Sequence, residues 1–583
     1  MTERPGRPFA LSGINQWLEQ THSAGFELRR HFFLRFFDSD LVSTPGQWRV
    51  VAIGAVSILL SLSILWVQAY YHKYLELNQQ PTSEPYRMAQ LADIGFVITL
   101  AMFAIGLFTT LQWTALFPGL RDYLALAALP IRMSQIFAAK FTALLGFAGI
   151  FIVAVTLLPS VSLPAVMSGQ YAARLVWQVP AIFISSSLAA VFVFFTLVTV
   201  QGVLLNLLTT APFGRLSLAA QGVLLTALLC GLPFVFSIPG LPPHMRQRPH
   251  WLLWTPPAWF LGVDQAIAGN REPFARSLAW LAIAGVAAAA CAAIASYWWS
   301  YRRHKVRLLE SRVAAHRPER RWAAAIASRM NTRELAVFSF IAKTLNRSRP
   351  HRLVLTAYAG VALAMICESF VSLAVARNFR GFSVSTPALR QAAVSAPLAL
   401  SLFVLGGFRY LFRLPVELRA NWIFRMNESG NRLRFLAAVE RFLLYCAIAP
   451  VALLTLPLET RLLGPSAGCA AALLCLLPSL TLMELALLQF EKIPFTSSYL
   501  PGRRPLIETL LLYTVAITLY VTVLGGLIAW CLRAPVSTLV LAIGLAAVWW
   551  RTRTARLQVR EFGNLEFEES IEPAVLTLSI FRD

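Results

Sequence analysis

Long uninterrupted runs of apolar residues dominate the chain and recur along its whole length. The run at residues 95–117 has no polar face, so it cannot form a helix on the surface of a water-soluble protein. About 20 apolar residues cross the hydrocarbon core of a bilayer, where each backbone N–H and C=O must be paired within the protein. The pattern therefore predicts an all-α, polytopic membrane protein.

We expect about 12 transmembrane helices in two groups of six, each group forming one half of the chain. The runs of the first half are residues 50–71, 95–116, 141–161, 179–205, 216–236 and 277–299. The runs of the second half are residues 353–375, 392–407, 442–457, 467–489, 509–530 and 535–550. Polar and basic stretches separate the two groups and flank them.

Matching landmarks recur about 300 residues apart, which indicates that one membrane plan is written twice. Glu27 and Glu334 each open a Glu-Leu pair in an amphipathic stretch ahead of the first run of a half. Leu120 and Leu418 each open a Leu-Arg pair between the second and third runs. The repeat predicts two parallel six-helix bundles that face the membrane in the same sense.

The expected organisation follows this plan. Residues 1–48 form an N-terminal segment with an interfacial amphipathic helix, and residues 49–300 form the first six-span half. Residues 301–352 form a basic linker with a second amphipathic helix, followed by the second six-span half at 353–551 and a tail at 552–583. The linker carries 14 Lys and Arg against three Glu, which places it in the cytosol by the positive-inside rule. Both termini are then expected to be cytosolic.

The composition agrees with this class, since 57% of the residues are hydrophobic and 14% are charged. The net charge of +23 would suggest nucleic-acid binding in a soluble protein, but cytosolic loops account for it here, and no nucleic-acid-binding motif is present. We therefore expect no nucleic-acid partner. The seven cysteines form no CxxC pair and lie in or beside apolar runs, which is typical of packing residues.

The segments between the second and third runs of each half are the best candidates for mechanism. In the first half, residues 117–140 combine a short amphipathic helix with a break at Pro130, a design suited to a cytosolic lever, although a plain interfacial loop remains open. In the second half, Leu411, Leu414, Leu418 and Trp422 are expected to line one face of a helix, before a turn at 427–431. The candidate coupling residues are Leu120, Arg121, Tyr123, Leu124, Pro130, Ile131, Arg132, Leu418, Arg419, Trp422 and Arg425.

The run Leu129-Pro130-Ile131-Arg132, followed by Lys140 at the start of the third span, resembles the membrane subunits of ABC exporters of the ABC-2 type (type V exporters). The Trp- and Pro-rich segment 250–260 and the Asp264…Gly269 ending are also similar to this family. The resemblance covers most of residues 26–299. It implies an interfacial helix before six spans and a coupling segment between spans two and three. The second half departs from the pattern, because its Leu-Pro pair precedes the expected helix.

The resemblance implies a permease subunit of an ATP-driven exporter in a bacterial inner membrane, with both halves supplied by one chain. The chain has no GxxxxGK[ST] motif, so it is not expected to be an enzyme or to bind a cofactor. ATP and Mg²⁺ would belong to a separate ABC ATPase subunit, present in two copies, and membrane lipids would be the other partners. No catalytic or metal-binding constellation is expected.

Glu368 and Glu484 fall inside apolar runs, where ionisable residues are costly and often functional. Either one could line a substrate path or take part in proton coupling. Each could also be a hydrogen-bonded structural residue or lie close enough to the interface to reach water. Two other functions remain open: a secondary transporter of about 12 spans, and a membrane-embedded enzyme of lipid or glycan assembly.

Overall fold

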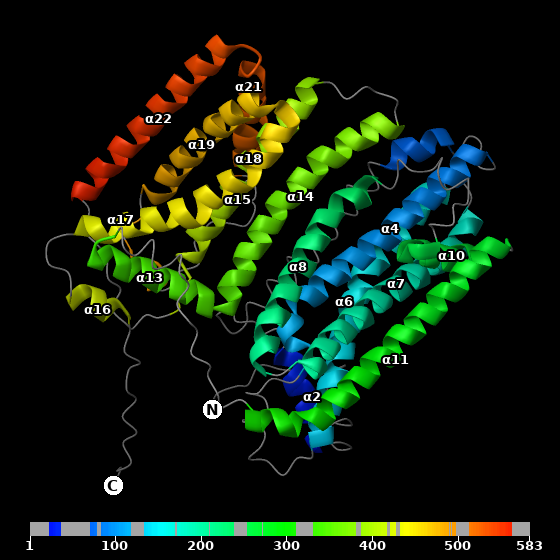
Figure 1. The fold of residues 1–583 in the computed structure, drawn as a ribbon. Coiled ribbons are helices and arrows are strands. Elements are labelled where there is room, and N and C mark those ends of the chain that lie inside the picture. Colours follow the sequence, from blue (N-terminus) through cyan, green and yellow to red (C-terminus); the bar gives the residue numbers. More distant parts are fainter. Residues whose placement is uncertain are drawn as a thin grey trace, which may run out of the picture. The chain divides into compact units, whose positions relative to one another are not determined.

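The structure is a computed structural model, and in the residues that it describes all regular secondary structure is helical (Figure 1). The described residues are 23–35, 70–77, 83–117, 133–168, 172–208, 210–237, 253–270, 272–310, 330–379, 386–414, 416, 420–426, 432–488, 490, 492–496, 512 and 514–562.

Within the described residues, eleven helices are long and apolar enough to cross a membrane. They correspond one to one with the predicted runs other than 50–71, nearly all of which lies outside the described residues. The predicted all-α, multi-pass membrane class is therefore confirmed. Several helices extend beyond the apolar runs, as in Ser134–Met167 and Phe435–Leu463, because polar residues at the ends of a span continue the helix outside the hydrocarbon.

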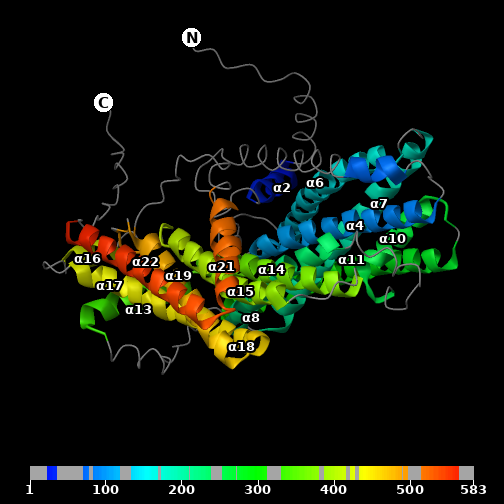
Figure 2. The same ribbon diagram turned by 90° about the horizontal axis from the view of Figure 1, so that it is seen from above.

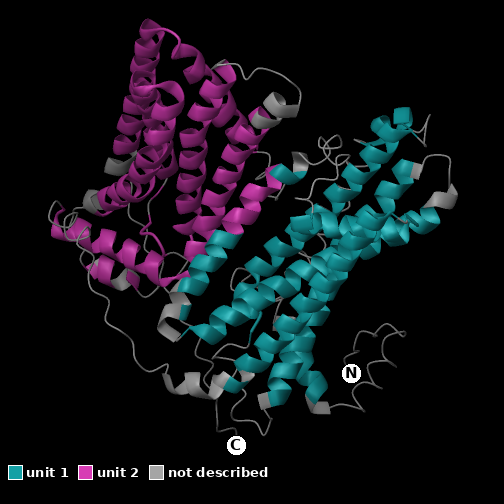
Figure 3. Ribbon diagram, turned by 45° about the vertical axis from the view of Figure 1, so that its right-hand side comes forward, with its two compact units in different colours: residues 1–224, 234–315 teal, residues 225–233, 316–583 magenta. Residues whose placement is uncertain are grey.

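The chain divides into two compact units, coloured separately in Figure 3. The first unit comprises residues 1–224 and 234–315, and the second comprises residues 225–233 and 316–583. The helices of the first unit are α2 (Ser23–Arg35), α4 (Glu84–Leu111), the 3-10 turn η1 (Trp113–Ala115), α6 (Met133–Ser168), α7 (Ala172–Leu207), α10 (Pro256–Ile267) and α11 (Pro273–Glu310). Helix α8 (Thr210–Ser237) has residues in both units.

In the first unit, α7 packs against α4, α6, α10 and α11 (Figures 1 and 2). Helix α2 is the described part of the predicted N-terminal amphipathic helix. Its Phe32 is fully buried against α6, with the Lys140 ammonium 5.0 Å from the ring, whereas Arg29 and Arg30 are exposed. One face of α2 thus belongs to the bundle and the other carries charge.

Beyond α4, the turn η1 is fastened by neutral hydrogen bonds. The Trp113 indole donates to the Ser217 hydroxyl at 2.9 Å, and the Gln201 amide donates to the Trp113 carbonyl. The buried Tyr297 hydroxyl of α11 donates to the Leu116 carbonyl. The chain is therefore held by three helices where it enters the first predicted coupling segment.

The helices of the second unit are α13 (Thr332–Arg347), α14 (Arg349–Phe379), α15 (Thr386–Leu411), α16 (Asn421–Met426), α17 (Arg432–Leu443), η5 (Leu444–Ile448), α18 (Ala449–Leu463), α19 (Pro465–Leu487), η6 (Thr518–Val523), α21 (Leu524–Cys531) and α22 (Pro535–Phe562). Both η5 and η6 are π-helical turns inside longer spans. Helix α13 is the amphipathic helix expected in the basic linker. Asn331 and Glu334 form a capping box at its start, and its apolar face packs on α17 (Figure 1).

The largest core of this unit gathers α13, α15, α17 and α19, and is rich in phenylalanine rings. Phe408, Phe412 and Phe442 contact one another with ring centroids 5.7 to 6.5 Å apart. A second core joins α15, α19 and α21. The first core lies at the end of the bundle that carries α13 and α16, where the candidate coupling residues of this half are found (Figure 1).

Candidate functional site

The structure describes only part of the predicted coupling residues. Outside the described residues lie Leu120, Arg121, Tyr123, Leu124, Pro130, Ile131, Arg132, Leu418 and Arg419. The backbone of Trp422 and Arg425 belongs to α16. Coupling in the first half stays a prediction, and only the second half offers a site with geometry.

One part of the prediction is wrong. Leu411 and Leu414 do not continue on one helical face towards Trp422, since α15 ends at Leu411 and the chain turns over residues 412–414. Pro415 follows in the sequence and disfavours helix in the residue before it. Leu411 is instead fully buried in the core, and the next helix that the structure describes is the short α16.

Among the side chains of α16 that the structure describes, Phe424 attaches the helix to the bundle. The Phe424 ring is 5.4 Å from the Phe340 ring of α13 and 6.0 Å from the Phe435 ring of α17, both edge to face. On either side of Phe424, Ile423 is 48% exposed and Met426 is 76% exposed. Of its described side chains, the helix therefore buries the aromatic Phe424 and presents the apolar Ile423 and Met426 outward.

The segment that leads to α16 is held by two backbone hydrogen bonds to Phe495, and we call this arrangement the clasp. The Phe495 amide donates to the Phe412 carbonyl at 3.3 Å, and the Val416 amide donates to the Phe495 carbonyl at 3.0 Å. Phe495 has a φ of 69°, a left-handed conformation that strains any residue with a Cβ. Its ring is fully buried against Phe412 and His351, and this burial holds the strained backbone in place.

A line of ion pairs joins four helices at this end of the unit. Arg441 of α17 pairs with Glu334 of α13, while the neighbouring Glu440 accepts a hydrogen bond of 2.6 Å from Arg556 of α22. Arg556 also pairs with Glu484 of α19, and both of these side chains are fully buried. Through the consecutive residues Glu440 and Arg441, helix α17 is therefore paired with both α22 and α13.

Glu484 was predicted from the sequence, and the structure places it against Arg556. The sequence analysis missed Arg556, because it follows the last apolar run among several arginines and reads as part of the tail. Arg551 is exposed and Arg553 packs over the Trp549 ring, so nothing in the local pattern distinguishes the buried one. Only the packing of α22 on α19 selects it.

Glu368 occupies a different environment, since its side chain is exposed near the end of the span in α14. On the neighbouring surface of α14, a cavity of about 260 Å³ opens between α14, α15 and η6. Neutral hydroxyl and amide side chains line it together with apolar ones. The polar members are Ser369, Ser372, Gln391, Ser395 and Thr522. Glu368 itself is not among the lining residues.

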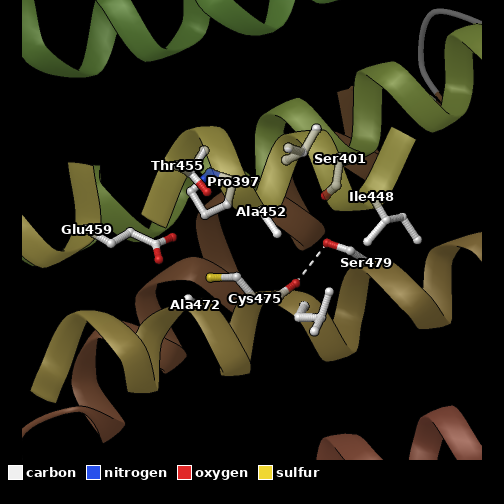
Figure 4. Close-up of a pocket in the computed structure, with 11 residues that line it drawn as sticks. Pro397, Ser401, Ile448, Ala452, Thr455, Glu459, Ala472, Cys475 and Ser479 are labelled. Carbon is white, nitrogen blue, oxygen red and sulfur yellow. Dashed lines mark hydrogen bonds between the residues drawn. The ribbon is translucent and has the colours of Figure 1, made fainter. Parts of the chain in front are cut away.

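A second cavity, of about 20 Å³, lies between α15, α18 and α19 (Figure 4). The Glu459 carboxyl of α18 points into it towards the Cys475 thiol of α19, with Thr455 one turn earlier on α18. Glu459 is fully buried, and neither carboxylate oxygen has a hydrogen-bond partner among the described residues. The sequence analysis did not single out Glu459, because it lies just beyond the apolar run at 442–457 and resembles a loop residue.

The first unit buries two aspartates that were also not predicted as sites. Asp93 of α4 accepts hydrogen bonds of 2.9 and 2.7 Å from Lys73 and one of 2.7 Å from the Tyr74 hydroxyl. Asp264 of α10 lies outside the spans, and its Oδ1 atom has no hydrogen-bond partner among the described residues. Burial raises the pKa of the Asp264 carboxyl to about 7, because the ionised form loses hydration.

No family model, curated protein sequence or solved structure matches the chain. The described residues contain no cluster of three His, Cys, Asp or Glu side chains that could hold a metal ion. The candidate site is therefore defined by geometry: a small exposed helix on an aromatic anchor, a strained clasp behind it, and ion pairs that lead from α17 into the membrane bundle.

Proposed function

We propose that the chain is the membrane-spanning permease subunit of an ATP-driven exporter of the ABC-2 type, energised by a separate ATPase. The protein would lie in the inner membrane of a bacterium with both termini in the cytosol. The loops between the second and third spans of each half would receive the ATPase. One chain would supply both halves, for two ATPase copies.

The observation that carries the proposal is the attachment of α16. A loop that only links two spans has no need of an aromatic anchor, a strained clasp and a chain of ion pairs. These features suit an element that bears force, because rigid elements with two discrete arrangements transmit motion between distant sites. The exposed apolar side chains of Ile423 and Met426 would lie against a groove of the partner.

Motion would pass from α16 to the bundle through α17. A displacement of Phe424 would shift Phe435, whose ring it contacts. The resulting rotation of α17 would move Glu440 and Arg441 together. Arg441 would carry the motion to the amphipathic α13, and Glu440 would carry it through Arg556 to α22 and α19. The spans would then rearrange around the substrate path.

The test uses the full chain purified with its partners from membranes in a gentle detergent and reconstituted in vesicles. We expect vanadate-sensitive ATPase activity to co-purify with the chain. Met426→Asp should reduce that activity at least about tenfold, because a charge replaces an apolar contact at the interface. Thr554→Asp, which adds the same charge to α22, is the matched control and should retain the activity. A preparation with transport but without ATPase would exclude the proposal.

A second candidate, an ion-coupled secondary transporter, is favoured by one observation. The Glu459 carboxyl lies inside the bundle and has no hydrogen-bond partner in the part of the chain that the structure describes, as expected of a group that binds a coupling ion. Transport driven by an imposed ion gradient, insensitive to vanadate and unaffected by Met426→Asp, would support this function over the first.

A further inference from the structure

The small cavity of the second unit has a lining rich in hydrogen-bond acceptors. The Ser479 hydroxyl donates its proton to the Cys475 carbonyl at 2.8 Å, and the Ser401 hydroxyl donates to the Leu398 carbonyl at 3.0 Å (Figure 4). A hydroxyl that has donated its proton presents only lone pairs to other groups. Together with the Glu459 carboxylate, the cavity therefore offers several oxygen acceptors.

Proline residues interrupt the backbone pairing of the helices around the cavity. Each of the three helices around the cavity carries a proline inside it: Pro397 in α15, Pro457 in α18 and Pro478 in α19. A proline cannot donate to the carbonyl one turn earlier, so that oxygen loses its usual intrahelical partner. The π-helical turn η5 also runs directly into the lining at Ile448, and such turns occur often at functional sites.

Among the described residues, no basic side chain lines the cavity to balance the carboxylate. The ionisable groups that line it are Glu459 and the Cys475 thiol, while Tyr520 of η6 lies behind, its hydroxyl 3.3 Å from that of Ser401. An isolated carboxylate in a medium of low dielectric constant costs several kcal/mol, roughly, unless a counter-charge accompanies it. Either a proton on the carboxyl or a cation in the cavity would remove this cost, and the experiment below distinguishes the two.

The volume of the cavity and the charge of its lining limit which ion can occupy it. A volume of about 20 Å³ holds one water molecule or one ion of similar size. A single carboxylate balances one positive charge, whereas divalent cations generally require more anionic ligands and a larger shell. Oxygen ligands suit a hard alkali cation. We propose that Glu459 and Thr455, neighbours on α18, form a binding site for one sodium-like monovalent cation in the cavity between α18 and α19.

This inference goes beyond the proposed function, because it concerns the isolated chain and needs no ATPase. The test measures thermal unfolding of the full chain in detergent through the reaction of its buried Cys475 and Cys531 thiols with a fluorescent dye. We compare sodium chloride with choline chloride at equal ionic strength. Sodium should raise the midpoint temperature in a saturable manner, and binding of radioactive sodium should approach one ion per chain.

Variants make the assignment specific. Glu459→Gln should abolish the sodium effect, and Glu368→Gln, which neutralises an exposed glutamate of the same unit, should leave it unchanged. Thr455→Val should raise the half-saturating sodium concentration about tenfold, the cost of one lost ligand contact, and serves if the Glu459 variant fails to fold. Equal stability in sodium and choline, or a sodium effect that persists in Glu459→Gln, would overturn the site. So would stabilisation that follows proton concentration alone.

Discussion

Two glutamates of the second unit are buried in the bundle, and they differ in whether a basic side chain balances the carboxylate charge. Glu484 of α19 and Glu459 of α18 are both fully buried within helices of one bundle. Glu484 pairs with the buried Arg556, which also binds Glu440, whereas the cavity that receives Glu459 has no basic residue among its described lining residues. The first arrangement locks helices together. The second leaves a place for a charge that comes from outside the chain.

The difference suggests a division of labour within the unit. The ion-paired region adjoins α16 and α17 and would behave as a rigid transmission element. The region around Glu459 is built from proline-containing helices and a π-helical turn, whose backbone pairing is incomplete and can therefore rearrange. A bundle with one rigid region and one adjustable region would be suited to converting a displacement of α16 into a rearrangement of the substrate path.

The largest expected effect comes from removing the arginine. Arg556→Ala takes away the guanidinium shared by two carboxylates and leaves Glu484 buried without it. We expect a loss of about 3 to 5 kcal/mol, since breaking a buried ion pair costs far more than removing an exposed charge. In the dye-based unfolding assay the midpoint should fall by many degrees.

Arg551→Ala is the matched control for that experiment. It deletes the same charge from the same helix, at an exposed position, and should change stability by less than about 0.5 kcal/mol. Equal effects of the two substitutions would contradict the view that Arg556 locks the helices and would remove the contrast with Glu459.

A smaller effect is expected where α18 and α19 approach each other beside Glu459. A Cβ atom at Gly468 would lie 2.6 Å from the Thr460 Cα atom and 2.7 Å from the Thr460 amide nitrogen. These are backbone atoms and cannot move aside alone, so Gly468→Ala must push the two helices apart. We expect a loss of about 1 to 3 kcal/mol and a weakened sodium effect.

Gly544→Ala in α22 serves as the control, because a Cβ there meets nothing within 4 Å. Alanine is the better helix former, so this variant should gain about 0.5 to 1 kcal/mol under the same conditions. A Gly468 variant that behaves like the Gly544 variant would mean that the spacing of α18 and α19 does not matter for the cavity.

The smallest effect concerns Asp264 in the first unit, a carboxyl that resembles Glu459 in having an oxygen without a hydrogen-bond partner. Its pKa of about 7 exceeds that of an aspartate in the unfolded chain. Between about pH 4 and 7 the unfolded chain therefore binds fewer protons than the folded one, and stability falls as the pH rises. Asp264→Asn should remove this slope, so that its stability relative to the parent protein rises with pH between about pH 4 and 7.

The measurement is the unfolding midpoint of the two proteins across this pH range, with all other carboxyls in place. Unchanged pH dependence in the Asp264 variant would show that the aspartate is hydrated in the folded protein. Glu459 would then be compared with Glu484 alone, within the second unit.

The sequence by itself determined the membrane class and all eleven spans found in the described residues. Uncharged apolar runs long enough to cross the hydrocarbon core have no other stable structure than a helix. It also determined the amphipathic helix α13, whose capping box and apolar face are local in sequence. It singled out Glu484, since an acid inside a long apolar run is visible without any neighbours.

Tertiary structure alone decided which charges matter and what they face. Arg556 is one of several arginines in a row, and only the packing of α22 against α17 and α19 makes it a buried partner. Glu459 looks like a residue at the end of a span until α15 and α19 close the cavity around it. Periodicity and hydropathy report how each helix meets its solvent. Pairing between helices distant in the chain depends on their relative rotation and depth, which no local pattern records.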